Sequence, residues 1–205
     1  MTSSSSKLEG ACITREQFLL RETRVVARLR AEGLGDEQVI DKVASENLIQ
    51  YPTDHMVRNI ASVCVKRLNA LSNPTLESVI ARGEPEAAAQ ANLYAMMRTY
   101  PLVRDFMEAV VARQYEERDL TLGKREMNAW VTRVRGDYDN IAKLSDATMT
   151  KVKQVLRNAL VHCGMLRSSR SSELLPVALD LDVRDAIVEL GDKGALRAFG
   201  AAVPR

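Results

Sequence analysis

Residues 145–164 have the sequence SDATMTKVKQVLRNALVHCG. Apolar residues recur in it every three or four positions, which predicts a helix from Asp146 to Cys163 with one buried face. Ser145 is a favourable N-cap, and Gly164 is a favourable residue after the helix end. The predicted buried face comprises Met149, Val152, Val155, Leu156, Ala159, Leu160 and Cys163. A helix with this pattern packs against other helices, and we therefore predict an all-α protein.

The opposite face of this helix is polar and basic. The residues on or beside it are Ala147, Thr150, Lys151, Lys153, Gln154 and Arg157. Gln can pair with adenine, Arg can pair with guanine, and Thr can contact phosphate or a thymine methyl group. This face is therefore a candidate for reading the DNA major groove, and the alternative is an ordinary solvated helix surface.

Positive charge is concentrated around the same helix. Between Thr121 and Arg170 there are ten Lys and Arg residues and four Asp and Glu residues, a net charge of +6, whereas the whole chain carries +2. The basic residues outside the helix that we assign to this surface are Lys124, Arg125, Arg133, Arg135, Arg167 and Arg170. Clustered positive charge is typical of proteins that bind a polyanion.

The sequence before this helix predicts the other parts of a helix-turn-helix unit. Residues 124–134 have the pattern of an amphipathic helix, and residues 137–144 predict a short one. In such a unit the last helix enters the major groove. Residues 165–181 predict either a small β-hairpin, which would form a wing, or an irregular loop, because Pro176 and several serines disfavour strands.

A second unit with the same order of helices is predicted near the N-terminus. Residues 15–31 and 36–47 predict two helices, and Thr53 caps a longer one from Asp54 to Leu71. The polar face of this longer helix is a second, less basic candidate for DNA contact. Its residues are His55, Arg58, Asn59, Ser62 and Lys66.

These patterns predict a compact multi-helix protein with two helix-turn-helix-like units. Proline-containing breaks separate the predicted segments, since the residue before a proline avoids helical conformation. We expect a disordered lead-in over 1–13, a first unit over 14–72, central packing helices over 73–120, the basic unit over 121–181, and a terminal helix with a fraying tail over 182–205.

The sequence has no catalytic or metal-binding motif. His55 and His162 are far apart, and neither H-x-x-x-H nor C-x-x-C spacing occurs. The glycine-rich phosphate-binding motifs and G-x-S-x-G are also absent. We therefore predict a non-enzymatic protein with no cofactor, no metal and no small-molecule substrate.

Cysteine content and hydropathy predict the cytoplasm and no membrane association. Cys12, Cys64 and Cys163 are widely spaced, and the N-terminal MTSSSSKLEG has no apolar core of a signal peptide. No stretch approaches the roughly 18 consecutive apolar residues of a membrane span. Aromatic residues make up 4% of the chain, which disfavours stacking platforms for single-stranded nucleic acid.

Four ungapped blocks resemble the BrxA family, small accessory proteins of bacteriophage-exclusion (BREX) defence islands. The blocks are RETRVVARLRAEGLGDEQVIDKVASENLIQ (21–50), RNIASVCVKRLNAL (58–71), YAMMRTYPLVRDFMEAVVARQY (94–115) and LSDATMTKVKQVLRNALVHCGML (144–166). The resemblance implies a cytoplasmic, nearly all-helical protein with helix-turn-helix units that binds duplex DNA. It also implies production together with a DNA methyltransferase, an ATPase and other defence proteins.

The predicted function is a non-enzymatic component of a BREX system that binds double-stranded DNA, with long helices in the major groove and basic side chains on the phosphates. One alternative is a protein–protein adaptor of the defence complex, which would need an exposed apolar patch. Another is a helical RNA-binding module, although the deep, narrow major groove of RNA cannot admit a helix. The expected partners are duplex DNA and other BREX proteins.

Overall fold

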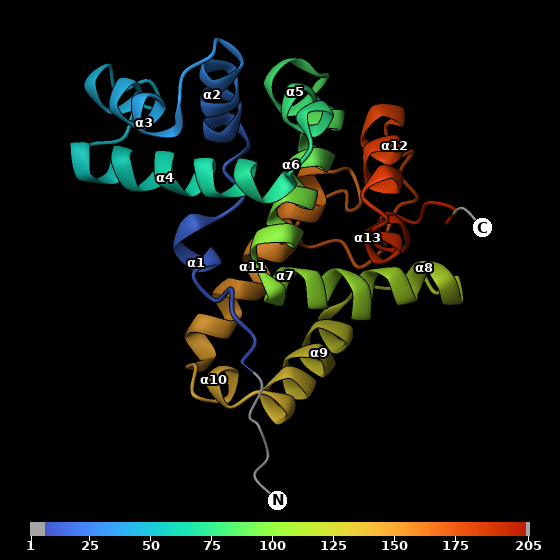
Figure 1. Cartoon of the computed structure of the whole chain (residues 1–205). Coiled ribbons are helices and arrows are strands. Elements are labelled where there is room, and N and C mark those ends of the chain that lie inside the picture. The colour runs from blue at the N-terminus through green and yellow to red at the C-terminus, as the bar shows by residue number, and fades with distance from the viewer. Residues whose placement is uncertain (1–6, 204–205) are drawn as a thin grey trace, which may run out of the picture.

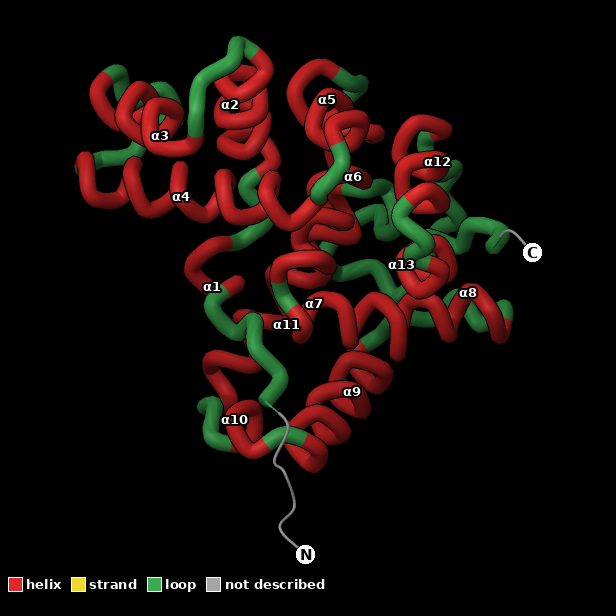
Figure 2. Tube along the Cα trace, in the orientation of Figure 1, coloured by secondary structure: helices red, strands yellow, loops and turns green. Residues whose placement is uncertain are grey.

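The computed structural model describes residues 7–203, and this part of the chain consists of helices and loops without a β-strand (Figure 2). The predicted all-α class is confirmed. The helices are α1 (Ile13–Glu16), α2 (Leu20–Ala31), α3 (Asp36–Ser45), α4 (Asp54–Leu71), α5 (Pro74–Arg82), α6 (Pro85–Thr99), α7 (Pro101–Phe106), the π-helix η1 (Met107–Ala112), α8 (Arg113–Glu117), α9 (Lys124–Asp137), α10 (Asp139–Ala142), α11 (Asp146–His162), α12 (Leu181–Glu189) and α13 (Lys193–Ala198). No described helix is both long and apolar enough to cross a membrane.

Helix α6 lies at the centre of the molecule. Every residue from Ala87 to Met97 is buried, because the helix contacts α2, α4, α5, α7, α11 and α12 on its different sides. A helix that is buried all round is expected to have small and apolar residues on every face. Around it, Figure 1 shows α2, α3 and α4 at one end and α9 and α10 at the other.

The predicted helix over residues 15–31 is broken into α1 and α2. Gln17 and Leu19 adopt left-handed backbone conformations, with φ of 45° and 50°. The buried guanidinium of Arg67, from α4, accounts for the break. This guanidinium donates to the carbonyl groups of Glu16, Gln17 and Phe18 at 3.3, 2.6 and 2.8 Å. Since these carbonyls are directed at Arg67, they cannot accept from amides further along a continuous helix.

Residues 7–12 belong to the folded structure, unlike the predicted disordered lead-in. Leu8 is buried, and its amide donates to Asn140 Oδ1 at 3.2 Å while its carbonyl accepts from Asn140 Nδ2 at 2.9 Å. The amide of Leu102 also donates to the carbonyl of Glu9 at 2.8 Å. Residues 1–6 of the predicted lead-in lie outside the described residues.

The predicted fraying tail after Gly191 contains the short helix α13. Asp192 is buried and caps this helix by accepting from the amide of Ala195 at 3.0 Å. The same carboxylate accepts from Arg104 at 2.6 Å and from the hydroxyl of Tyr94 at 3.1 Å. One buried carboxylate therefore attaches the C-terminal helix to α6 and α7.

The predicted wing hairpin does not form strands, and the alternative of an irregular loop is confirmed. β-Pairing in the described chain is limited to an isolated antiparallel bridge between Thr121 and Glu173. Arg157 contacts the loop instead, and it donates to the carbonyl groups of Ser169 and Ser171. Those carbonyls are thus occupied by a side chain and not by a partner strand.

Candidate nucleic-acid interface

Helix α11 has the amphipathic arrangement that the sequence predicts. Ser145 Oγ accepts from the amide of Thr148 at 3.1 Å and caps the helix, and all seven residues of the predicted apolar face are buried. On the outer face, Ala147, Thr150, Lys151 and Gln154 are exposed. The helix therefore presents free polar side chains near its N-terminal half.

A groove of about 650 Å³ runs beside this face, between α11, the start of α9 and the loop after α11. We call it the basic groove. Its lining residues are Gly123, Lys124, Met127, Asn128, Thr150, Lys153, Gln154, Arg157, Ser169, Arg170, Ser171 and Ser172. Four of these residues are basic and none is acidic. A concave surface lined by one sign of charge concentrates the electrostatic field and attracts counter-charged ligands.

The side chain of Arg157 lies against the loop after α11 and the segment before α9, and not outward toward a base as the sequence predicts. Its Nε donates to the carbonyl of Ser169 at 2.8 Å, its Nη1 donates to that of Leu122 at 2.9 Å, and its Nη2 donates to that of Ser171. Burial lowers the pKa of this guanidinium from its ordinary value. Arg157 thus joins the loop to the segment before α9 and shapes the basic groove.

Other predicted cations around this groove have free charges. Lys124, Lys151, Arg167 and Arg170 are exposed, and the described structure records no ion pair for them. Lys153 Nζ donates to Asn128 Oδ1 at 2.8 Å, a neutral partner that leaves its charge uncompensated. These side chains can therefore approach phosphate groups without first breaking an ion pair.

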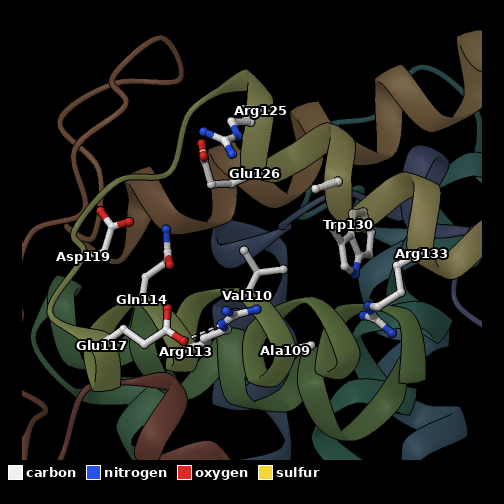
Figure 3. A pocket seen from close by; sticks show the side chains of 11 residues that line it. Ala109, Val110, Arg113, Gln114, Glu117, Asp119, Arg125, Glu126, Trp130 and Arg133 are labelled. Atoms are coloured by element: carbon white, nitrogen blue, oxygen red, sulfur yellow. Dashed lines mark hydrogen bonds and ion pairs between the residues drawn. The ribbon is translucent and has the colours of Figure 1, made fainter.

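Arg125 and Arg133 face a second cleft, of about 410 Å³, between α9 and the helical stretch of η1 and α8 (Figure 3). Arg133 pairs with Asp105, which also accepts from Trp130 Nε1 at 2.8 Å. Three arginines and three carboxylates line this cleft, including Arg113 and its partner Glu117. Such a balanced lining does not favour a polyanion.

Arg135, another predicted contact, links α9 to the start of α11. It pairs with Asp146 at 2.7 Å and donates to the carbonyl of Leu144 at 2.8 Å. Because Leu144 lies in the turn before α11 and Asp146 is the first residue of the helix, Arg135 attaches the start of α11 to α9.

The polar face of α4 is exposed as predicted, but its charge is largely compensated. Arg58 pairs with Asp41 at 2.7 Å and with Asp54 at 3.0 Å, and these hydrogen bonds raise its pKa. The other predicted residues also have local partners, His55 with Asn59, Ser62 with the carbonyl of residue 58, and Lys66 with the ring of Tyr100. Residues 36–59 contain five acidic and two basic residues, so this surface is less suited to phosphates.

Comparison with known proteins identifies the family. The family model of BrxA matches residues 10–191. The chain belongs to the BrxA family. Similar relatives are the BREX protein BrxA of Bacillus cereus, 28% identical over 176 residues (85% of this chain and 88% of the relative), and that of Escherichia coli, 26% identical over 179 residues (86% and 82%).

A solved structure shares the fold of this BrxA family member. It is a crystal structure of an uncharacterized protein from Magnetospirillum magneticum, with a TM-score of 0.79 and 22% sequence identity. The similarity covers 93% of this chain and 97% of that one. The arrangement of helices is therefore common to both proteins.

Several residues of the basic groove in this BrxA family member are missing from the sequence prediction. Asn128 comes from α9, and Ser169, Ser171 and Ser172 come from the loop after α11. The signal that could have indicated them is the stretch RSSRSS, residues 167–172, in which serines alternate with basic residues. Hydroxyl groups beside arginines are common phosphate contacts in DNA-binding proteins.

Proposed function

We propose that this BrxA family member is a non-enzymatic component of a BREX phage-defence system that binds double-stranded DNA through the basic groove. The observation that carries the proposal is a groove with four basic residues and no acidic residue, next to the exposed face of a capped helix. The names of its relatives, BREX protein BrxA, support the defence role.

Charge neutralisation supplies most of the affinity in this proposal. Phosphates contact Lys124, Lys151 and Lys153, and their condensed counterions are released. In this proposal α11 acts as the recognition helix of a helix-turn-helix unit, and its start enters the major groove. Thr150 and Gln154 then face the base edges, where an amide can pair with adenine. The face of α4 is a second and weaker contact.

A salt titration tests the proposal. Binding of a labelled random duplex is measured by fluorescence anisotropy over a series of salt concentrations. Neutralisation of about five phosphates gives a slope of log K against log salt of about −4 to −5. Binding without any salt dependence, or no binding at all, would contradict the proposal.

A matched pair of variants locates the site. The double variant Lys151→Glu, Lys153→Glu should bind DNA much more weakly with a flatter slope, because Lys153 lines the basic groove and Lys151 is exposed on the same helix. Lys193→Glu reverses one exposed charge at the start of α13, which does not line the basic groove, and should leave affinity nearly unchanged. Equal affinity of the double variant and the unmodified protein would place the DNA site elsewhere.

The alternative functions have less support in the structure. The large apolar side chains that are exposed in the described chain are Met56 and Leu181, which lie on different helices. An adaptor surface would need a contiguous patch of such residues. RNA binding is separated from DNA binding by competition, since structured RNA should displace the labelled duplex poorly if α11 enters a major groove.

A further inference from the structure

The loop after α11 has the chain connectivity of a wing although it forms no strands. The amide of Leu175 donates to the carbonyl of Met165 at 2.9 Å, which closes the loop on itself. The amide of Leu174 donates to the carbonyl of Leu120 at 2.8 Å, and that of Leu122 donates to Ser172 at 2.7 Å. The loop is therefore joined to the segment that precedes α9, as a hairpin would be.

This loop is held in one position by contacts from α8 and α11 in addition to those from the segment before α9. Arg157 of α11 donates to the carbonyl groups of Ser169 and Ser171, and the hydroxyl of Tyr115 from α8 donates to that of Leu175 at 2.8 Å. Leu174 is fully buried. A surface that is ordered before binding loses less conformational entropy when a ligand arrives.

Residues 167–172, which we call the loop tip, present two arginines to solvent. Arg167 and Arg170 are exposed, and no acidic residue occurs between Gly164 and Ser172. Ser169 and Arg170 line one side of the basic groove, and Thr150 and Gln154 of α11 line the other. The basic groove is thus bordered by α11, by the loop and by the start of α9.

A DNA duplex has a complementary shape. One sugar–phosphate strand separates its major groove from the adjacent minor groove, and that strand carries a negative charge every 3.4 Å or so. If that strand lies in the basic groove while α11 occupies the major groove, the loop lies on the minor-groove side of the strand. Resting on the proposed function, we infer that Arg167 and Arg170 contact the minor groove and give the protein a preference for A/T-rich flanking sequence.

The chemistry of arginine accounts for that preference. Runs of A·T pairs have a narrow minor groove with an enhanced negative potential, which attracts inserted arginine side chains. Such contacts read the width of the groove and not the identity of each base. Lys124 and Lys151 have no such selectivity in this arrangement, because phosphates are the same in every sequence.

Two duplexes of equal length and charge test the inference, one with an A-tract and one with only G·C pairs in the flanking positions. The unmodified protein should bind the A-tract duplex several-fold more tightly, and netropsin, a ligand of A/T minor grooves, should remove the difference. Equal affinity for both duplexes, or no effect of netropsin, overturns the inference while leaving duplex binding intact. Failure to bind either duplex overturns the proposed function and the inference together.

Two double variants separate the roles of the basic residues. Arg167→Ala, Arg170→Ala should bind both duplexes equally and lose its response to netropsin. The control Lys124→Ala, Lys151→Ala also removes two exposed charges, and it should weaken binding to both duplexes while retaining their affinity ratio. If the arginine variant retains that ratio, the arginines contact phosphates only and the inference is wrong. Circular dichroism verifies that both variants are folded.

Discussion

The guanidinium of Arg67 donates to the carbonyl of Phe18 at 2.8 Å in the interior of the protein. This contact joins α4 to the break between α1 and α2. The ring of Phe18 in turn stacks on His162, at the end of α11, with centroids 4.8 Å apart and 7° between the planes. The helices on either side of the molecule are therefore linked through one short, strained segment.

Replacing Arg67 should strongly destabilise the protein. Arg67→Met leaves the carbonyl groups of Glu16 and Gln17 without their donor, whereas that of Phe18 still accepts from Asn92 at 2.7 Å, and each unsatisfied buried group costs about 1–3 kcal/mol. We expect the free energy of unfolding, measured by urea denaturation, to fall by about 3 kcal/mol or more. Arg67→Lys retains the charge but not the planar fork of donors, and its loss in the free energy of unfolding should be smaller than that of the Met variant. A loss of less than about 0.5 kcal/mol for the Met variant would contradict this role.

The stack of Phe18 and His162 should make a measurable contribution of its own. Aromatic pairs contribute about 0.5–1.5 kcal/mol beyond the area that they bury. A double-mutant cycle with Phe18→Leu and His162→Leu should give a coupling energy in that range. Strictly additive effects of the two substitutions would show that the rings are neighbours without a specific interaction.

Removing Arg157 should loosen the loop more than the helices. In Arg157→Met, hydrogen exchange at the amides of Leu122 and Leu174, which join the loop to the segment before α9, should accelerate. The substitution removes two contacts to carbonyl groups of the loop and one to the carbonyl of Leu122. The amide of Leu156, inside α11, is the internal control and should exchange at its usual rate. Unchanged exchange at the amides of Leu122 and Leu174 would show that the backbone contacts alone hold the loop.

The N-cap residue of α11, Ser145, should stabilise the folded protein. Ser145→Ala removes the acceptor for the amide of Thr148, and loss of an N-cap costs about 1 kcal/mol. Thermal or urea denaturation measures the change. Ser62→Ala, in the middle of α4, is the comparison, and it should not destabilise because alanine favours a helix interior.

The two candidate recognition helices should differ in their importance for DNA binding. Arg58→Gln removes a charge that Asp41 and Asp54 already compensate, whereas Lys151→Gln removes an unpaired one. We expect the Lys151 variant to lose more affinity and more of the salt dependence in the same anisotropy titration. A larger loss in the Arg58 variant would make α4 the principal contact.

Local sequence predicts helices well where caps and periodicity agree. The predicted span 54–71 matches α4, and the predicted span 146–163 differs from α11 by one residue at its end. In both helices a Thr or Ser side chain caps the first turn. These signals lie within a few residues of the helix that they define, so no distant contact is needed to interpret them.

The candidate site could be predicted only in part. Charge composition indicates the segment from 121 to 170, but helical periodicity gives a side chain's direction about its own helix axis and nothing more. Arg125 and Arg133 consequently appear in the same set as Lys124, although they line another cleft. Long arginine side chains can reach partners on other elements, and Arg157 donates hydrogen bonds to backbone carbonyls of the loop.

The sequence by itself determined the all-α class, the two long capped helices and the concentration of positive charge near the second of them. Only the tertiary structure decided which basic residues share a groove and where the N-terminal helix breaks. The reason is the same in both cases. Helix signals act over three or four residues, whereas Arg67 acts on carbonyl groups about fifty residues away along the chain and Arg157 connects two segments that only folding brings together.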